Sequence, residues 1–376
     1  MKSVPDAKEK PTNILEWLIS NLAGLFISVA MPIITFGVLI IVFKWLRATT
    51  PNTMTEKVLV SLVAIVWGVG GALILYLISN KVVEQLPPKW VKLLQPFIFV
   101  GPAVVILLWY LALPAARTFW ISLFNRDGTQ FVGLSNYVAV FTERDMLEAF
   151  RNNVLWIIFG ASLSVIAGLI ISVLADRSKF ENLAKSLIFL PMAISMVGAG
   201  VIWNFIYEVK DVADPQIGLL NAIMVLFGGK PQAWTALNQP WNNLFLIVIL
   251  IWMQTGYAMV IFSAAIKGIP EELIEASRVD GANELQIFFR IMIPYIMGTI
   301  ITVSTTVIIF TLKIFDVVWV MTGGQFGTHV IATQFYRQAF TNQNKGFASA
   351  IAIVLLIAVV PVMIYNLKQF SGKEAF

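Results

Sequence analysis

Long apolar stretches separated by polar connections dominate the sequence, and eight of them approach the ~20 residues that a helix needs to cross a bilayer core. They cover residues 22–45, 58–79, 97–119, 154–174, 187–206, 244–265, 296–320 and 348–365. Strands of a membrane barrel would instead alternate in polarity over about ten residues. The pattern therefore predicts an all-α integral membrane protein with about eight transmembrane helices. Small residues inside these stretches would let helices approach closely, at Gly68, Gly71, Gly160 and Gly168.

One polar connection, residues 267–294 and here termed the elbow, is too long for a tight turn. Pro270 and the two glutamates after it suit the start of a helix, because proline fits the first turn and carboxylates favour the positive end of the dipole. Gly281 interrupts this run, and an apolar face follows before Pro294. The pattern predicts a pair of short helices that docks something outside the membrane.

The composition agrees with lipid as the main solvent. Of 376 residues, 58% are hydrophobic and 12% are charged, whereas an ordinary soluble domain is about half apolar and about a quarter charged. The net charge of +5 is scattered between the apolar stretches and forms no basic stripe, which argues against a nucleic-acid partner. If the N-terminus is cytoplasmic, 14 Lys and Arg residues lie inside and 11 outside, with Lys313 within a stretch. This is a weak bias in the direction of the positive-inside rule.

The sequence contains few of the residues and motifs that catalytic sites require. It has no cysteine, which excludes disulfides, thiol catalysis and cysteine-ligated metals, and its one histidine, His329, disfavours a histidine metal site or a catalytic triad. The phosphate-binding pattern G-x-x-x-x-G-K-[ST] is missing from the sequence, so ATP hydrolysis must take place on another polypeptide. The basic N-terminal segment lacks a small-x-small cleavage site, and we expect it to be retained. We expect neither an enzyme nor a metal protein.

The elbow also carries a family motif. It reads Ile269-Pro270-Glu271-Glu272-Leu273-Ile274-Glu275-Ala276-Ser277-Arg278-Val279-Asp280-Gly281-Ala282, followed by Phe288, Ile291 and Pro294. This run closely resembles the EAA coupling loop of ABC importer permeases, whose pattern is E-A-A-x-x-D-G-A and then F-x-x-I-x-L-P. Ser277 replaces the third small residue of the pattern, and Ile293 replaces its leucine.

A second motif narrows the resemblance. Residues 131–137 look like the F-x-G-L-x-N-Y signature of the carbohydrate-uptake branch, of the maltose-permease type. Further similar segments follow in the order of that family, at residues 190–191, 201–203, 218–221 and 321–324. The resemblance runs nearly continuously from Pro96 to the C-terminus and departs at residues 325–327, where the family has a third glycine and a proline. In character the chain is most similar to α-glucoside and glucosylglycerol permeases.

The resemblance implies a type I ABC importer permease fold. It implies a core of six helices in residues 96–376, preceded in residues 1–95 by a cytoplasmic tail and two extra transmembrane helices. The elbow would face the cytoplasm and, with six stretches before it and two after it, both termini would do so as well. Such a subunit lies in the inner membrane of a bacterial cell and imports a sugar or a sugar-like osmolyte by alternating access.

The resemblance also implies the partners. They are a second homologous permease, two ATP-binding cassette ATPase subunits and an extracytoplasmic solute-binding protein. ATP and magnesium would bind to the ATPase subunits, so we expect no cofactor in this chain and no nucleic acid. Residues 145–148 and 210–242 would offer surface to the binding protein.

By the same resemblance, the elbow couples the chain to the ATPase. Glu275 would contact the ATPase, and the small residues after it would let the helix lie deep in a cleft. Gly281 would permit a turn that a side chain obstructs, with Asp280 as a cap. The predicted coupling set is Glu275, Ala276, Ser277, Asp280, Gly281, Ala282, Ile291 and Pro294.

Neutral sugars are usually held by hydrogen bonds and aromatic faces. By the same resemblance, solute contacts are expected in the sixth and seventh stretches, where Met253, Gln254, Tyr257, Thr311 and Ile314 fall at or near positions at which maltose-type permeases contact sugar. The set is Trp252, Met253, Gln254, Tyr257, Thr311, Lys313, Ile314 and Asp316. The alternative is that these side chains pack between helices, with Trp252 in an interfacial belt. Lys313 and Asp316 are ionisable groups within a stretch and, three residues apart, would share a helix face and neutralise each other. We expect no chemistry from His329 in its outer loop.

Two other function classes stay open. A secondary solute–ion symporter would show inverted repeats with broken helices at matched positions, which the sequence does not reveal. A membrane-bound glycosyl or acyl transferase would need clustered acidic or histidine residues at the membrane surface. An ABC permease for amino acids or phosphate would share the elbow but not the segment at 131–137. The sequence leaves open which solute is moved and whether the second permease differs from this one.

Overall fold

The computed structural model describes residue 34 and residues 37–51, 53–84 and 88–371. Over these residues the regular structure is helical, with one isolated antiparallel bridge between Phe124 and Phe131. The predicted all-α class is confirmed. The chain divides at Pro114 into two compact units, which are described separately. The functional boundary predicted after residue 95 stays a prediction.

Two long helices form most of the described part of the N-terminal unit. They are α3 (Met54–Glu84) and α4 (Pro88–Leu107), and the π-helical turn η1 (Leu108–Ala112) leads from α4 into α5 (Leu113–Ser122). Tyr76 on α3 packs edge-on against Phe99 on α4, with ring centroids 5.2 Å apart. Most other large side chains of these helices are exposed, as expected for a surface that faces lipid.

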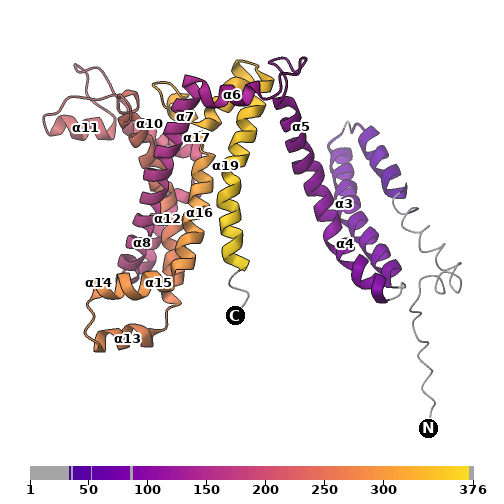
Figure 1. Cartoon of the computed structure of the whole chain (residues 1–376), viewed down its shortest axis with the longest axis horizontal. Helices are drawn as coiled ribbons and strands as arrows, with labels where there is room; N and C mark the ends of the chain where they lie inside the picture. The colour runs from indigo at the N-terminus through magenta and orange to yellow at the C-terminus, as the bar shows by residue number, and fades with distance from the viewer. Residues whose placement is uncertain (1–33, 35–36, 52, 85–87, 372–376) are drawn as a thin grey trace, which may run out of the picture. The chain divides into compact units, whose positions relative to one another are not determined.

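The second unit is a bundle built around α12 (Trp241–Lys267), the most buried of its long helices (Figure 1). The other long elements are α7 (Arg144–Leu155), η2 (Trp156–Ala161), α8 (Ser162–Asp176), α16 (Met297–Leu312) and α19 (Lys345–Ser371). Shorter elements join them: α6 (Ser135–Thr142), α9 (Glu181–Phe189), η3 (Leu190–Ala193), α10 (Met196–Tyr207), α11 (Leu219–Leu226), η4 (Trp234–Ala236), α13 (Glu271–Val279), α14 (Glu284–Ile287), η5 (Phe288–Met292), α15 (Ile293–Tyr295), α17 (Asp316–Thr322), α18 (Ile331–Tyr336) and η6 (Arg337–Thr341).

Glycines allow α12 to pack closely against the run of η2 and α8. A Cβ on Gly168 would lie 2.5 Å from the Cβ of Ala258, and one on Gly160 would lie 2.7 Å from a Leu250 methyl group. Both distances are too short for a real contact, so larger residues would push the helices apart. The predicted role of these two glycines in close packing is confirmed, whereas Gly68 has open space around it.

Within the described residues, five helices are long and apolar enough to cross a membrane, or up to seven if each of two bent pairs counts as one span. The five are Met54–Lys81, Ala103–Ser122, Arg144–Asp176, Trp241–Lys267 and Lys345–Asn366. They coincide with the second, third, fourth, sixth and eighth predicted stretches. Most of the first stretch, 22–45, lies outside the described residues, so the total of eight stays a prediction.

The fifth and seventh stretches are not the straight helices that hydropathy suggests. The chain bends by 103° between Glu181–Ala193 and Met196–Tyr207, where Pro191 and the N-cap Ser195 interrupt the backbone ladder. The seventh stretch, predicted at 296–320, follows a bend of 73° and its helix α16 ends at Leu312.

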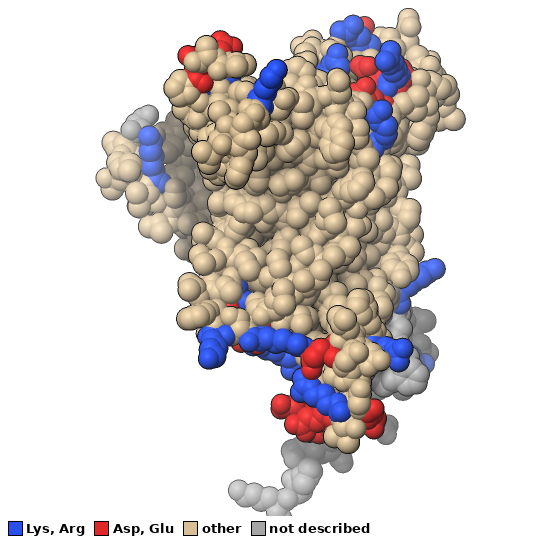
Figure 2. Space-filling view, turned by 90° about the vertical axis from the view of Figure 1, so that its left-hand side faces the viewer, with Lys and Arg blue, Asp and Glu red and all other residues tan. Residues whose placement is uncertain are grey.

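Charge gathers at the two ends of the second unit. Figure 2 shows Lys, Arg, Asp and Glu side chains at both ends of the face it draws, with a broad uncharged band between them. The elbow helix α13 lies at one end, and α6, α7 and α17 lie at the other (Figure 1). This distribution suits a bundle that crosses a bilayer.

Candidate functional site

The elbow is a helix followed by a sharp turn, as predicted. Pro270 is the N-cap residue of α13, and Asp280 is its C-cap. Gly281 adopts a left-handed backbone with a φ of 81°. Its N–H donates to the carbonyl of Arg278, and the N–H of Ala282 donates to that of Ser277, both at 3.0 Å. This is the Schellman arrangement, in which glycine best accommodates the left-handed position.

A second short helix returns the chain to the bundle. Asn283 and Gln286 form a reciprocal capping box at the start of α14. The Glu284 carboxylate then pairs with Arg278 at 3.1 Å and with Arg177, at the end of α8, at 2.5 Å. The two helices of the elbow are therefore linked to each other and to the bundle by one acidic side chain.

Most of the predicted coupling residues are open to solvent. Glu275, Ala276, Asp280, Gly281 and Pro294 are exposed, while Ser277, Ala282 and Ile291 are half-buried. On the opposite face of α13, the Ile274 side chain packs against an apolar cluster that contains Ile269 and Ile287. The elbow thus has one face held by the bundle and one face left free.

Val279 on the free face escaped the sequence analysis. Its side chain is 88% exposed, although it lies outside the apolar spans. Leu273 and Leu285 are exposed nearby in the elbow. Several exposed apolar side chains within one short element are typical of an interaction surface.

A network of ionic side chains at the base of the bundle, here termed the base network, was also missed. Lys185 on α9 pairs with Asp176 on α8 and with Glu181, each at 2.5 Å. The Ser263 hydroxyl on α12 donates to Asp176 at 2.7 Å, and Lys267 pairs with Glu181. The network joins three helices next to the elbow, and no sequence spacing signals it because its members come from separate segments.

The predicted solute contacts on α12 divide into two kinds. Met253 is buried in the main apolar cluster, and Trp252 packs edge-on against Trp203 at 5.8 Å. Gln254 and Tyr257 are half-buried. Among the described residues, the Gln254 side chain has no hydrogen-bond partner. Its amide is therefore available to another molecule.

The other predicted contacts lie in or beside a break between α16 and α17. Thr311 is buried and donates to the carbonyl of Val307 at 2.7 Å, and Ile314 shares the buried cluster of Met253. The prediction that Lys313 and Asp316 share a helix face is wrong, because α16 ends at Leu312 and α17 begins at Asp316. In the described part of the chain these two side chains form no ion pair with each other, and Lys313 is exposed.

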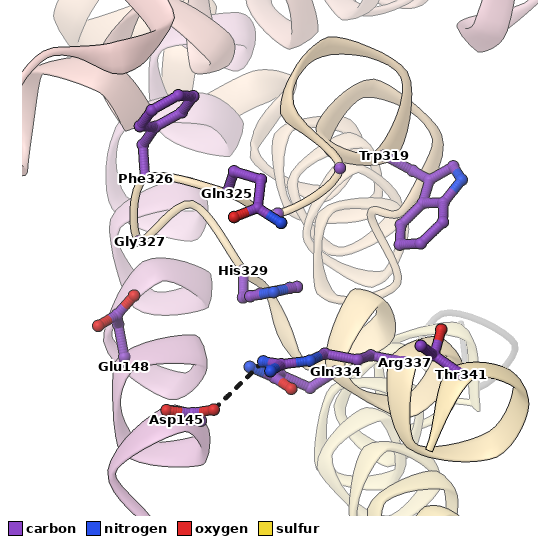
Figure 3. Close-up of a pocket in the computed structure, with 12 residues that line it drawn as sticks. Asp145, Glu148, Trp319, Gln325, Phe326, Gly327, His329, Gln334, Arg337 and Thr341 are labelled. Atoms are coloured by element: carbon purple, nitrogen blue, oxygen red, sulfur yellow. Dashed lines mark hydrogen bonds and ion pairs between the residues drawn. The ribbon is translucent and has the colours of Figure 1, made fainter. Parts of the chain in front are cut away.

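A polar cavity of about 390 Å³ opens at the end of the bundle opposite the elbow, and is here termed the distal cavity. Figure 3 shows Asp145 and Glu148 on one helix, the loop from Gln325 to His329 above them, and Trp319 across the opening. Asp145 pairs with Arg337 at 3.2 Å. Burial, followed by the nearby Arg337 charge, lowers the pKa of His329, so its imidazole is neutral at pH 7.

Buried asparagines hold the loop over this cavity. The amide of Asn152 donates to the carbonyls of Gly327 and His329, each at 2.8 Å. Asn242 donates to the carbonyl of Phe326 at 2.6 Å, and Asn153 accepts from the N–H of Ile331 at 2.8 Å. The loop at residues 325–327, where the chain departs from the family pattern, is therefore fixed by side chains from α7 and α12.

Comparison with known proteins gives consistent matches. Residues 160–370 match the family model described as binding-protein-dependent transport system inner membrane component. The osmoprotective compounds uptake permease protein GgtC of Synechocystis is 51% identical over 73% of this chain and 99% of its own length. The alpha-glucoside transport system permease protein AglF of Rhizobium meliloti is 50% identical over 75% of this chain and 84% of its own.

A solved structure shares the fold of the chain. A chain of a bacterial alginate ABC transporter, crystallised with its alginate-bound periplasmic protein, matches with a TM-score of 0.61 and 20% identity. The match covers 73% of this chain and 94% of that one.

Proposed function

Because the chain belongs to the family of binding-protein-dependent transport system inner membrane components, we propose that it forms part of the path by which an ATP-driven importer moves a neutral sugar or a sugar-like osmolyte. The resemblance to ABC importer permeases is confirmed, and the chain is an integral inner-membrane permease subunit that is not itself an ATPase. The symporter alternative has no support.

The observation that carries the coupling mechanism is the free face of the elbow. A capped helix with one face packed against the bundle and one face exposed can be displaced by an ATPase subunit without unfolding. Glu275 would bond to that subunit, while Ala276 and Ser277 let α13 lie close to it. Ile274 and the base network would then carry the movement to α8, α9 and α12.

We place the elbow in the cytoplasm, together with both termini of the chain. The distal cavity, residues 145–148 and residues 210–242 then lie on the outer side, where a solute-binding protein docks. The remaining partners are a second permease and two ATPase subunits, which bind the ATP and magnesium that this chain has no motif to hold. The chain needs no cofactor of its own in this scheme.

The names of the relatives support a neutral sugar or a sugar-like osmolyte as the solute. One relative takes up osmoprotective compounds, another belongs to an alpha-glucoside system, and a third belongs to a trehalose/maltose system. Within this chain, Gln254 and Tyr257 are half-buried predicted contacts with uncharged polar atoms that a neutral solute could reach. The buried residues Met253, Thr311 and Ile314 would pack behind the side chains that line the path and hold them in position.

The test is reconstitution of the whole importer in liposomes with ATP on the elbow side. Uptake of labelled trehalose or an α-glucoside should require ATP, the binding protein and an intact elbow, and the solute-loaded binding protein should stimulate ATP hydrolysis. Uptake that follows an ion gradient without ATP would refute the proposal.

A further inference from the structure

The distal cavity is lined by polar side chains that the bundle leaves without partners. In the described part of the chain, the half-buried Glu148 carboxylate makes neither an ion pair nor a hydrogen bond. The Gln334 side chain is only 1% exposed and also has no partner, and its Oε1 is buried. Trp319 and Thr341 also line this space, and their side-chain polar atoms have no hydrogen-bond partner among the described residues. Of these groups only Gln334 is buried, and because buried polar atoms are normally satisfied, its Oε1 is expected to meet a ligand.

The charges in the cavity disfavour an anion, because the Glu148 carboxylate has no counter-charge among the described residues. Arg337 is already neutralised by Asp145, which leaves little to attract an anion. His329 is neutral at pH 7 because burial lowers its pKa. For a metal ion, Glu148 alone is an unpaired carboxylate, and the described residues contain no group of three His, Asp or Glu side chains that could hold one.

The remaining chemistry fits hydroxyl groups. The Glu148 carboxylate accepts hydrogen bonds, and the amides of Gln325 and Gln334 both donate and accept them. Trp319 also stacks with Phe315 at 5.6 Å and packs against Tyr336, so its ring is held in place as a flat apolar surface. A volume of about 390 Å³ lies near the lower end of the range for small-molecule sites. Mixed donors and acceptors beside a fixed aromatic ring suit a sugar of one or two rings.

The cavity is shaped before any ligand arrives. Gly323, Gly324 and Gly327 all have positive φ angles, between 61° and 80°. A Cβ on Gly324 would overlap the His329 ring, and one on Gly327 would overlap Gln239. Together with the bonds from Asn152 and Asn242, this close packing fixes the loop, which lowers the entropic cost of binding.

We propose that the distal cavity is a binding site for a small neutral polyhydroxylated solute, separate from the contacts on α12. The binding chemistry follows from the cavity itself, and only its position on the outer side of the membrane rests on the proposed function. Such a site would hold the solute at the mouth of the path between its release from the binding protein and its entry among the helices.

The test measures trehalose and maltose binding to the purified importer without its binding protein. The complex should be held in lipid nanodiscs, because maltoside detergents carry a headgroup of the same class. Saturation-transfer NMR and calorimetry should show saturable binding that weakens about tenfold in Glu148→Gln and in Gln334→Leu. Glu143→Gln, an exposed acidic residue at the cap of the same helix and outside the cavity, is the matched control and should bind as wild type does. Thermal unfolding of each variant confirms that it is folded.

Three results would overturn the proposal: no saturable binding to wild type, equal binding to wild type and to both cavity variants, or Glu148-dependent binding of calcium in place of sugar. The outcome is independent of the uptake assay. ATP-driven uptake without binding at the cavity would remove this inference alone, whereas binding without ATP-driven uptake would remove the proposed function alone.

Discussion

The two ends of the second unit are held by different means. At the elbow end, α13 is fixed by a capped turn, one sunken isoleucine and surface ion pairs, and its other face is exposed. At the opposite end, the loop over the distal cavity is fixed by buried amides and tightly packed glycines. Surface ion pairs contribute little stability and can be rearranged, whereas buried amides cannot lose a partner cheaply. The difference suggests an elbow that transmits movement and a cavity that keeps its shape.

The largest effect is expected when a buried amide is removed. Asn152→Ala leaves the carbonyls of Gly327 and His329 without their donor and should destabilise the protein by about 2–3 kcal/mol. Thermal unfolding of the reconstituted complex measures this loss. Asn182→Ala, at an exposed position on α9, is the control and should leave the unfolding temperature unchanged. Equal stability of the two variants would contradict a rigid loop over the distal cavity.

The next effect tests the free face of the elbow. Glu275→Ala removes an exposed carboxylate that has no partner among the described residues, so the fold should stay intact. Loss of a charged hydrogen bond to the ATPase should weaken ATPase association by about 2 kcal/mol, or about thirtyfold. Titration of nanodisc-bound permease with the ATPase measures it. Glu272→Ala, also exposed and one turn earlier, is the control, and an equal loss in both variants would point to general charge rather than to a specific contact.

A smaller effect is expected at the turn that ends α13. Gly281→Asp forces a left-handed backbone on a residue with a side chain, which costs about 1–2 kcal/mol, although open space surrounds the site. We expect a folded permease whose ATP-driven uptake falls about tenfold. Gly128→Asp places the same residue at a φ of 77° in open space, in the turn between Phe124 and Phe131, and should leave uptake nearly normal. Normal uptake by the Gly281 variant would show that the turn is not part of coupling.

The smallest effect concerns a surface ion pair of the elbow. Arg278 and Glu284 are each about half exposed, so Arg278→Met should change the free energy of unfolding by about 0.5 kcal/mol or less. A double-mutant cycle with Glu284→Gln measures the coupling energy of the pair. A coupling energy of several kcal/mol would mean that the elbow is as rigidly held as the distal loop, and the contrast between the two ends would fail.

Much of this architecture follows from local sequence signals. Apolar stretches long enough for a bilayer predict the straight spans, and Pro270 with Gly281 predicts both ends of the elbow helix. The breaks at Ser195 and Lys313 were not predicted, because hydropathy is the same whether an apolar stretch is straight or bent. The assumption of one continuous helix then produced the wrong pairing of Lys313 with Asp316.

The base network and the distal cavity lie beyond the reach of local signals. Asp176, Lys185 and Lys267 meet only because α8, α9 and α12 converge. The cavity draws on segments from Asp145 to Thr341, and of its lining residues only Gly323 and Gly324 belong to a segment that resembles the family. Such sites depend on how distant segments pack, which periodicity along the chain does not report.

The exposed valine at the end of α13 has a consequence for how the cell must make this protein. A subunit synthesised in excess over its ATPase would display Val279, Leu273 and Leu285 to water with nothing to cover them. Surplus copies would then tend to self-associate or attract proteolysis. If an ATPase subunit covers the elbow as proposed, balanced synthesis of the two subunits would keep these side chains covered.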